Sequence, residues 1–335
     1  MEIEMEQKIA LVLGATGGIG GEVAARLSAF GWQVRALNRN PERAKNGGLD
    51  WIKGDALVAS DVLTAAQGAS LIVHAVNPPS YRDWEKLVLP MLENTIAAAK
   101  ANGARILLPG TVYNYGPDAF PEITEDAPQN ALTRKGQIRV EMERRLQQAT
   151  RNSAAKVLIV RAGDFFGPGA ANNWFSQGLI KPGARPNTIT YPGKRGVAHQ
   201  WAYIPDVAET MVRLLEQDGL ADFATFHMDG QWDADGTRMT DAIRRTLGSP
   251  IVPVKPMPWW LMRIAAPLVP LMRELYEMKY LWEHPVRLVN TKLEAAIGSE
   301  PRTPLDEAVK TTLVAIGCVQ LPAKPTPQAR VPAIA

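Results

Sequence analysis

The sequence predicts an α/β protein built on a doubly wound parallel sheet, with a smaller subdomain toward the C-terminus. Three observations support this fold class. Short apolar runs alternate with stretches of helical spacing up to Arg161, a glycine-rich turn follows the first run, and beyond Arg161 the alternation gives way to frequent Pro and Gly. Alternation of this kind is typical of a parallel sheet that helices cover on both faces.

The individual elements are predicted in chain order from this alternation. Strands are expected at Ile9–Leu13, Gln33–Leu37, Trp51–Lys53, Leu71–Val76, Arg105–Pro109 and Lys156–Arg161. Helices are expected between them at 21–29, 60–67, 83–101 and 134–149, and later at 206–216, 238–247 and 304–315. This order is of the Rossmann type, in which ligands bind at the carboxyl ends of the strands.

The turn after the first strand reads Gly14-Ala15-Thr16-Gly17-Gly18-Ile19-Gly20. A strand, a tight turn and a helix N-terminus in succession form the geometry that receives a dinucleotide pyrophosphate. Gly14 permits the turn, Gly17 lets the backbone approach phosphate oxygens, and Gly20 lets the helix pack close to the strand. The residues expected to bind this cofactor are Gly14, Thr16, Gly17, Gly18, Ile19 and Gly20.

Composition excludes several classes of partner. Hydrophobic residues make up 46% of the 335 residues, and 37 basic side chains stand against 34 acidic ones without a dense basic block, so nucleic acid is not an expected partner. Cys318 is the only cysteine and the four histidines lie far apart, so neither an intrachain disulfide nor a metal site is predicted. The acidic N-terminus lacks the basic start of a signal peptide, which favours a cytoplasmic location.

The segment from Met257 to Met272 is rich in Trp and other apolar residues. It is shorter than the ~20 residues of a membrane span, and Arg263, Pro267 and Pro270 interrupt it. No membrane span is therefore predicted. A packed lid or pocket wall is the favoured interpretation, and a contact with a membrane surface or within a homodimer stays open.

The glycine spacing resembles the cofactor loop of the extended and atypical short-chain dehydrogenase/reductase superfamily, with its NAD(P)-dependent epimerase/dehydratase-like family. Segments Gln200–Ala208 and Asn290–Leu305 resemble it too, so the resemblance covers residues 7 to about 317. It implies an NAD(P)-binding Rossmann domain over residues 1–165 and a mixed α/β substrate-binding part over 166–317, some segments of which return to the first domain. Residues 318–335 are Pro-rich and are expected to form a loose tail.

The end of the second strand favours one nicotinamide dinucleotide over the other. NAD-selective folds carry an acid there that binds the ribose 2′-OH, whereas this chain has Asn38 and Arg39. A guanidinium suits a 2′-phosphate, which favours NADP(H) over NAD(H); the alternative is that Arg39 is a surface charge that opens a helix. The resemblance adds contacts to the adenine and to the nicotinamide ribose by Asp55, Ala56, Leu57, Ala75, Val76 and Asn77.

The catalytic pattern of the family is only partly present. Members carry a Ser or Thr and then a Tyr-x-x-x-Lys pair, in which the tyrosine transfers a proton and the lysine lowers the tyrosine pKa and holds the nicotinamide ribose. Thr111 takes the Ser/Thr place. With Glu141 aligned to the acid that follows the lysine, Thr133 and Gln137 take the places of the tyrosine and the lysine. Neither side chain can transfer a proton near neutral pH.

Three explanations of this loss stay open: another acid, namely Tyr113, Tyr115 or Asp164; a substrate that supplies its own proton route; or NADP(H) binding without turnover. The leading interpretation is an NADP(H)-dependent oxidoreductase that acts on a carbonyl or alcohol of a small or medium organic substrate. The alternatives are a sugar-nucleotide epimerase or dehydratase and a non-catalytic NADP(H)-binding sensor. The side chains expected to face the substrate are Tyr115, Asp164, Asn172, Asn173 and Trp201.

Overall fold

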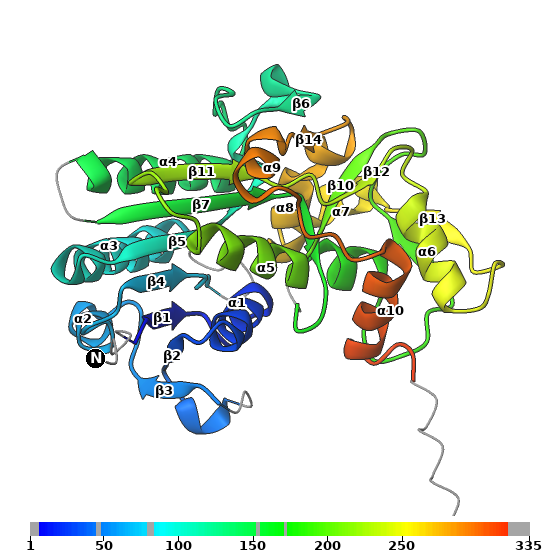
Figure 1. Ribbon diagram of the computed structural model, residues 1–335. Helices are drawn as coiled ribbons and strands as arrows, with labels where there is room; N and C mark the ends of the chain where they lie inside the picture. The colour runs from blue at the N-terminus through cyan, green and yellow to red at the C-terminus, as the bar shows by residue number, and fades with distance from the viewer. Residues whose placement is uncertain (1–6, 45–47, 79–83, 152–154, 171–172, 321–335) are drawn as a thin grey trace, which may run out of the picture.

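A computed structural model describes residues 7–44, 48–78, 84–151, 155–170 and 173–320. Its centre is a seven-stranded, wholly parallel sheet with the strand order β11-β7-β5-β4-β1-β2-β3 (Figure 1). The strands are β1 (Ile9–Leu13), β2 (Gln33–Asn38), β3 (Asp50–Lys53), β4 (Leu71–His74), β5 (Arg105–Thr111), β7 (Lys156–Ala162) and β11 (Phe223–His227). All but β11 lie where the sequence predicts them, and the predicted fold class is confirmed.

Helices cover both faces of this sheet because successive strand side chains point to opposite faces. In β1, Ala10 and Val12 join one buried core, and Leu11 and Leu13 join the other. The first core is closed by α1 (Gly18–Ala29) and α5 (Ile204–Leu215), and the second by α2 (Ala59–Ala65), α3 (Trp84–Asn102) and α4 (Arg134–Arg151). Strands buried on both faces are characteristic of parallel sheets.

The seventh strand, β11, is absent from the sequence prediction. Its residues, Phe223-Ala224-Thr225-Phe226-His227, mix a threonine and a histidine with apolar side chains, so no continuous apolar run marks it. It pairs parallel to β7 at the edge of the sheet. Residues beyond 166 therefore contribute a strand to the central sheet, as α5 contributes a helix to its cover.

The C-terminal part contains three small sheets and an aromatic core. The sheets are formed by β8 (Asp164–Phe166), β10 (His199–Tyr203) and β12 (Gln231–Asp233); by β9 (Ile189–Tyr191) and β13 (Val254–Pro256); and by β6 (Glu122–Ile123) and β14 (Arg287–Leu288). The helices are α6 (Arg238–Thr246), α7 (Trp259–Ala265), α8 (Pro270–Glu277), α9 (Thr291–Ile297) and α10 (Leu305–Ala315). Buried Trp174, Trp201 and Trp282 belong to one core cluster here.

The Trp-rich segment forms α7 and α8, two short helices beside the aromatic core. Neither has the length of a membrane span. Across the described part of the chain, no helix combines the length and the hydropathy needed to cross a bilayer.

Candidate active site

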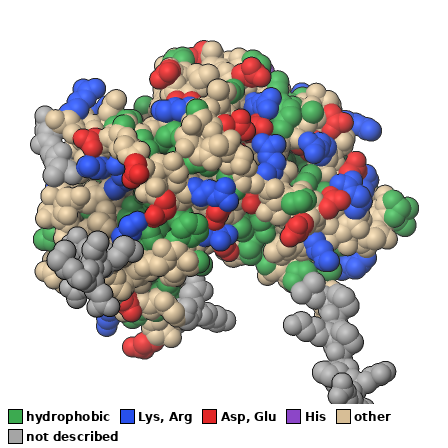
Figure 2. Space-filling model, in the orientation of Figure 1, with side chains coloured by type: hydrophobic (Ala, Val, Ile, Leu, Met, Phe, Trp, Pro, Cys, Tyr) green, Lys and Arg blue, Asp and Glu red, His purple; other side chains and the backbone are tan. Residues whose placement is uncertain are grey.

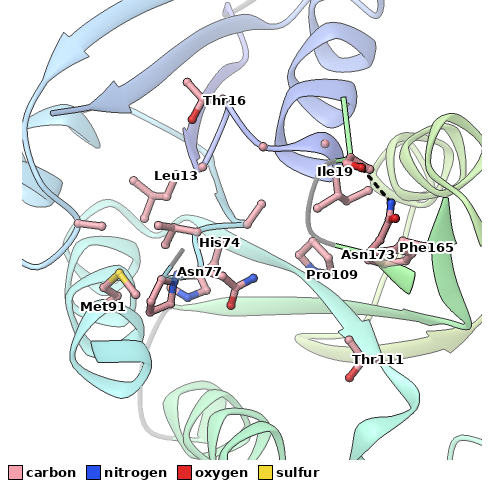
Figure 3. A pocket seen from close by; sticks show the side chains of 18 of the residues that line it. Leu13, Thr16, Ile19, His74, Asn77, Met91, Pro109, Thr111, Phe165 and Asn173 are labelled. Carbon is pink, nitrogen blue, oxygen red and sulfur yellow. Dashed lines mark hydrogen bonds between the residues drawn. The ribbon is translucent and has the colours of Figure 1, made fainter. Parts of the chain in front are cut away.

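A cavity of about 610 Å³ opens at the carboxyl edge of the central sheet. Its wall is formed by residues at or just beyond the ends of six strands, β1, β2, β3, β4, β5 and β7, and Figure 3 shows many of them converging on one space. The strand order reverses between β1 and β4. A crevice at such a reversal is where open α/β sheets bind their ligands.

The residues predicted to bind the cofactor lie together in this wall, with one exception. Those that line the cavity come from four loops: Gly14, Thr16, Gly17, Gly18 and Ile19; Asn38 and Arg39; Asp55, Ala56 and Leu57; and Ala75, Val76 and Asn77. Gly20 lies outside the wall. A Cβ atom at Gly20 would lie 2.2 Å from the Gly14 carbonyl oxygen, so this glycine serves the close packing of α1 that the sequence predicts for it.

The glycine turn forms a bare backbone cradle at the start of α1. Gly14 adopts a φ of +95°, and a Cβ atom there would lie 2.5 Å from the carbonyl oxygen of Ala75. A Cβ atom at Gly18 would lie 3.0 Å from Ala170. No side chain caps α1, and its first turn carries no acid. The amides of such a helix N-terminus favour an anion, so the cradle fits a dinucleotide pyrophosphate.

The loops after β2 and β3 form another stretch of the wall. Arg39 is exposed and lines the cavity directly after β2. The neighbouring Asn38 Oδ1 accepts a hydrogen bond from the Asn40 amide at 2.7 Å, which orders the turn. In the adjacent loop, Asp55 Oδ1 accepts a hydrogen bond from the Leu57 amide at 3.0 Å. No acid stands at the end of β2, as the sequence indicates.

Thr111 and Tyr113 lie next to one another in the wall, at the end of β5. The Thr111 hydroxyl accepts a hydrogen bond from the Tyr113 amide at 3.3 Å, and both residues line the cavity. Figure 3 shows Thr111 on the same side of the space as Phe165. Tyr113 is half-buried, so its phenol combines a fixed backbone with access to the cavity.

Tyr115, the other tyrosine of this loop, does not line the cavity. It is fully buried, and its hydroxyl accepts a hydrogen bond from Arg161 Nη1 at 2.7 Å and lies 3.2 Å from His227 Nε2. Burial is the largest cause that raises the pKa of the Tyr115 hydroxyl above its ordinary value. The substrate contact predicted for Tyr115 is therefore not formed by this geometry, because the side chain belongs to a buried network behind the wall.

Helix α4 is rotated relative to the alignment made on Glu141. Gln137 is exposed, and Glu141 pairs with Arg144 and Arg145 on the outer side of the helix, at 2.6 and 2.7 Å. The Thr133 hydroxyl accepts a hydrogen bond from the Gly136 amide at 3.1 Å, which caps the first turn. Neither Thr133 nor Gln137 lines the cavity. The two residues predicted at the tyrosine and lysine places thus contribute nothing to the cavity wall.

The inward face of α4 carries Lys135, Arg139 and Glu143 at the same four-residue spacing, and all three are buried. Glu143 is the acid of α4 that forms a buried ion pair: its Oε1 accepts a hydrogen bond from Nε of Arg161 at 3.0 Å. An alignment made on Glu143 puts Lys135 at the tyrosine place and Arg139 at the lysine place. Lys135 Nζ lies 3.0 Å from Glu274 Oε2 of α8, and it does not line the cavity.

Arg139 and His74 place a cation and a hydrogen-bond acceptor in the cavity wall. Both line the cavity, and Arg139 lies 5.2 Å above the ring of Trp84. The Thr95 hydroxyl donates to Met91 O at 3.1 Å, so it accepts from Nδ1 of His74 at 2.8 Å. The Nε2 atom of His74 has no hydrogen-bond partner among the described residues. Burial, and then Arg139, lowers the pKa of His74 to about 3, so Nε2 remains an acceptor at neutral pH.

Asp164 also lines the cavity, with a histidine partner that the sequence reasoning missed. The Oδ2 atom of Asp164 lies 2.9 Å from Nε2 of His199, and both side chains are buried. The His199 ring stacks on Trp282 with a centroid distance of 3.7 Å and an interplanar angle of 8°. The pairing follows from β10 lying beside β8, a long-range contact that neither strand's sequence reveals.

The remaining substrate predictions have different outcomes. Asn173 lines the cavity, but its side chain donates to Ala170 O at 3.1 Å and accepts from the Ser176 amide at 2.7 Å; the first of these bonds is drawn in Figure 3. Trp201 is fully buried in the aromatic core and does not line the cavity. Asn172 lies outside the described residues.

Several wall residues were not predicted from the sequence, namely Trp84, Met91, Arg139, Gln177 and Leu275. They come from α3, α4, the stretch that includes the short helix Phe175–Leu179, and α8. Arg139 alone carried a usable signal, since it stands four residues after Lys135 and four before Glu143. The others are apolar or amide side chains whose type does not mark a site.

The model of the NAD dependent epimerase/dehydratase family matches residues 10–223. The chain belongs to this family. It is 26% identical over 255 residues to a 3-diazoavenalumate denitrifying reductase of Streptomyces, a match that covers 72% of this chain and 82% of that protein. It is 27% identical over 188 residues to an uncharacterized protein of Sinorhizobium fredii; that match covers 50% of this chain and about half, 53%, of that protein.

The fold agrees with solved members of the same group. A structure of UDP-glucuronic acid 4-epimerase from Bacillus cereus, in complex with UDP-glucuronic acid and NAD, matches with a TM-score of 0.70 at 15% identity, over 92% of this chain and 98% of that one. Identity this low shows a shared fold. With the family match and the reductase relative, the chain is an NAD(P)-dependent enzyme of the extended short-chain dehydrogenase/reductase type.

Proposed function

We propose that this enzyme is an NADP(H)-dependent oxidoreductase that transfers a hydride to or from the carbonyl or alcohol carbon of a small or medium organic substrate. The observation that carries the proposal is the composition of one cavity. Its wall joins a bare glycine cradle and Arg39 to the hydroxyl groups of Thr111 and Tyr113. One space thus holds a phosphate cradle, a cation after β2 and a side chain able to transfer a proton.

The cofactor would be held by the residues of the four loops. Backbone amides at Gly18 and Ile19, the first residues of α1, would bind the pyrophosphate, and Arg39, with Asn38 beside it, would bind the 2′-phosphate. Asp55 would accept a hydrogen bond from the adenine amine through Oδ2, because its Oδ1 atom already accepts one from the Leu57 amide. When bound, NADP(H) supplies or accepts the hydride. Ala56, Leu57, Ala75, Val76 and Asn77 would complete the binding wall.

Three side chains would serve the reaction centre. Tyr113 would donate the proton to the substrate oxygen during reduction, and the neighbouring Thr111 hydroxyl would help to hold that oxygen. Arg139 takes the place at which related enzymes carry a lysine, and it would donate hydrogen bonds to the nicotinamide ribose. A guanidinium stays protonated, so Arg139 would contribute a fixed positive charge and no proton.

The reductase relative supports hydride transfer in a chain of this length. Its name describes the loss of nitrogen from a diazo compound. When a hydride replaces the N₂ group of a diazonium cation, the C–N bond breaks, its electron pair leaves with N₂, and the carbon gains the hydride; the two charges cancel and no proton is consumed. A substrate of this kind would need no Tyr-Lys pair, which agrees with the absence of that pair from α4 in this chain.

A sugar-nucleotide epimerase or dehydratase is the second candidate. It is favoured by the family match and by the likeness to a solved epimerase. The residue after β2 counts against it, because retained NAD is usually bound through an acid that accepts from the ribose 2′-OH, and Arg39 stands in that loop.

Calorimetric titration with NADPH, NADP⁺ and NADH tests the first step. We expect NADPH to bind at least tenfold more tightly than NADH, a difference of about 1.4 kcal/mol. Arg39→Ala should remove this preference, while Lys53→Ala, an exposed cation at the end of β3 outside the wall, should leave it unchanged. Equal affinities in the unmodified enzyme would contradict the cofactor proposal and favour the epimerase.

A screen of carbonyl and diazo compounds with NADPH tests the second step. Consumption of NADPH that depends on one of these substrates is the expected result. Tight NADPH binding without any turnover would instead support a non-catalytic sensor.

A further inference from the structure

A cluster of exposed apolar side chains covers the Trp-rich segment. Its members, between 41% and 86% exposed, are Trp260, Leu261, Ile264, Leu268 and Val269, and we call this set the apolar face. Five large apolar residues exposed within ten positions exceed the scattered single residues that an ordinary protein surface shows. The site described above uses none of them.

The apolar face is held on a fixed backbone. On the opposite side of α7, Met262 is buried, and Trp259 donates from Nε1 to Pro192 O at 2.8 Å. The carbonyl of Ala265 accepts hydrogen bonds from the amides of Leu268 and Val269, which forms a turn after α7. Positions 260 and 264 are four residues apart and lie on one side of α7, while Leu268 and Val269 belong to the turn that precedes α8. The exposed side chains therefore come from one side of α7 and from the turn that follows it.

Along the sequence, the charges next to the apolar face are basic up to Glu274. Between Ala242 and Arg273 the sequence contains five basic residues and no acid. Three of them are paired: Arg244 with Asp241, Arg245 with Asp306, and Arg273 with Glu274. Lys255 and Arg263 form no ion pair with any residue that the structure describes. A tryptophan and aliphatic side chains flanked by unpaired cations complement a surface that is apolar beneath and negative above.

We propose that the apolar face docks on the surface of an anionic lipid bilayer. Trp260 and the aliphatic side chains would enter the boundary between headgroups and acyl chains, where tryptophan is favoured. Lys255 and Arg263 would lie against the negative headgroups. A second copy of the chain is a poorer occupant, because a two-fold interface brings the same patch to itself and would place these unpaired cations near one another.

The docking surface adjoins the cavity. Trp259 of α7 packs against Trp174 with a ring-centroid distance of 6.0 Å, and Trp174 lines the cavity, as does Leu275 of α8. A bound membrane would therefore contact a segment that packs against one wall residue, Trp174, and closely precedes another, Leu275. The docking requires no assumption about the reaction.

Vesicle flotation with the full chain tests the proposal. We expect the protein to float with vesicles of phosphatidylglycerol and phosphatidylcholine, to float weakly with phosphatidylcholine alone, and to lose binding as salt rises. The double variant Trp260→Ser, Ile264→Ser should bind the anionic vesicles at least about tenfold more weakly. Arg263→Gln should weaken that binding about fivefold and leave the weak binding to neutral vesicles unchanged.

Leu63→Ser is the matched control, since Leu63 is 44% exposed on α2, away from the Trp-rich segment. It should bind as the unmodified chain does, and an unchanged thermal unfolding midpoint shows that each variant is folded. Absence of binding to anionic vesicles overturns the proposal, and so does equal weakening by Leu63→Ser. A dimer in sedimentation velocity that the double variant dissociates, without vesicle binding, assigns the face to a second copy instead.

Discussion

At the scale of single residues, the proton transfer that we propose depends on Tyr113. It is the tyrosine of this loop that lines the cavity, since Tyr115 is fully buried. We expect Tyr113→Phe to lower kcat for carbonyl reduction by at least about 100-fold, because it removes the proposed proton donor. The dissociation constant for NADPH should not change. Tyr276→Phe, in α8 and outside the wall, is the control.

If Tyr113→Phe keeps its activity, Tyr113 is not the proton donor. Asp164 is then the next candidate, because it lines the cavity with His199 behind it. If Asp164→Asn is also active, the substrate requires no protein acid, as when a hydride displaces N₂ from a diazonium cation. Steady-state kcat and the NADPH dissociation constant, measured for both variants, separate these outcomes.

Arg139 allows a direct test of the helix register. Arg139→Met should raise the NADPH dissociation constant by about tenfold or more, since a hydrogen bond from a charged group contributes roughly 1.5–3 kcal/mol. Arg139→Lys should restore part of the affinity. Gln137→Ala, two residues away on the exposed side of α4, should bind NADPH normally. If Gln137→Ala weakened binding while Arg139→Met did not, the alignment on Glu141 would be right after all.

The residues that were predictable from sequence are those that a local pattern defines. The glycine turn, Arg39 and Thr111 each follow directly from a strand end, and the carboxyl ends of parallel strands meet at one edge. His199 beside Asp164 was not predictable, because 35 positions separate the pair and no local pattern joins them.

At the scale of elements, α4 shows why the sequence alone places a helix but not its rotation. The apolar stripe Ile138, Met142, Leu146 and Ala149 is buried. Thr133, Gln137 and Glu141 flank this stripe on one side, and Lys135, Arg139 and Glu143 flank it on the other, so amphipathicity permits either face to turn inward. The buried guanidinium of Arg161 decides, because it needs a carboxylate and pairs with Glu143.

The first turn of α4 approaches the backbone of Tyr113 closely. A Cβ atom at Gly136 would lie 2.2 Å from the Tyr113 carbonyl oxygen. Gly136→Ala should therefore lower the free energy of unfolding by about 1–3 kcal/mol, the usual cost of overpacking, despite the better helix propensity of alanine. Urea unfolding measures this, with Gln137→Ala as the control on the same helix. A Gly136→Ala variant of unchanged or higher stability would show that α4 can move away from Tyr113 without cost.

At the scale of the whole molecule, six strands of the central sheet and the later helices α5, α6 and α10 were predictable, whereas β11 and the small sheets were not. Central strands are marked by runs of apolar residues because both faces are buried. The strands of the small sheets have only two to five residues and pair over long distances, such as β6 with β14. Such contacts are fixed by tertiary packing rather than by local pattern. The Trp-rich segment shows the same limit, since its sequence permitted a lid, a membrane contact or a dimer contact.

The whole fold also depends on two histidines that are neutral when buried. Burial, and then Arg139, lowers the pKa of His74 to about 3; burial, and then Arg161, lowers the pKa of His227 to about 3. In the unfolded chain both would have a pKa near 6.5. Below pH 6.5 the unfolded state therefore binds more protons than the folded state, and the free energy of unfolding falls as pH falls from 6.5 toward 3.

Each histidine should remove about 1.4 kcal/mol of stability between pH 7.5 and 5.5. Burial raises the pKa of Glu300 and Asp206, which increases the free energy of unfolding as pH falls. The test therefore compares chains that all retain these two acids, so that their contribution cancels. His227→Asn should lose about 1.4 kcal/mol less than the unmodified chain over this interval, whatever its stability at pH 7.5. His284→Asn, at an exposed position, should keep the full pH dependence. Urea unfolding at both pH values measures the difference, and an equal loss in His227→Asn would show that His227 is not neutral in the fold.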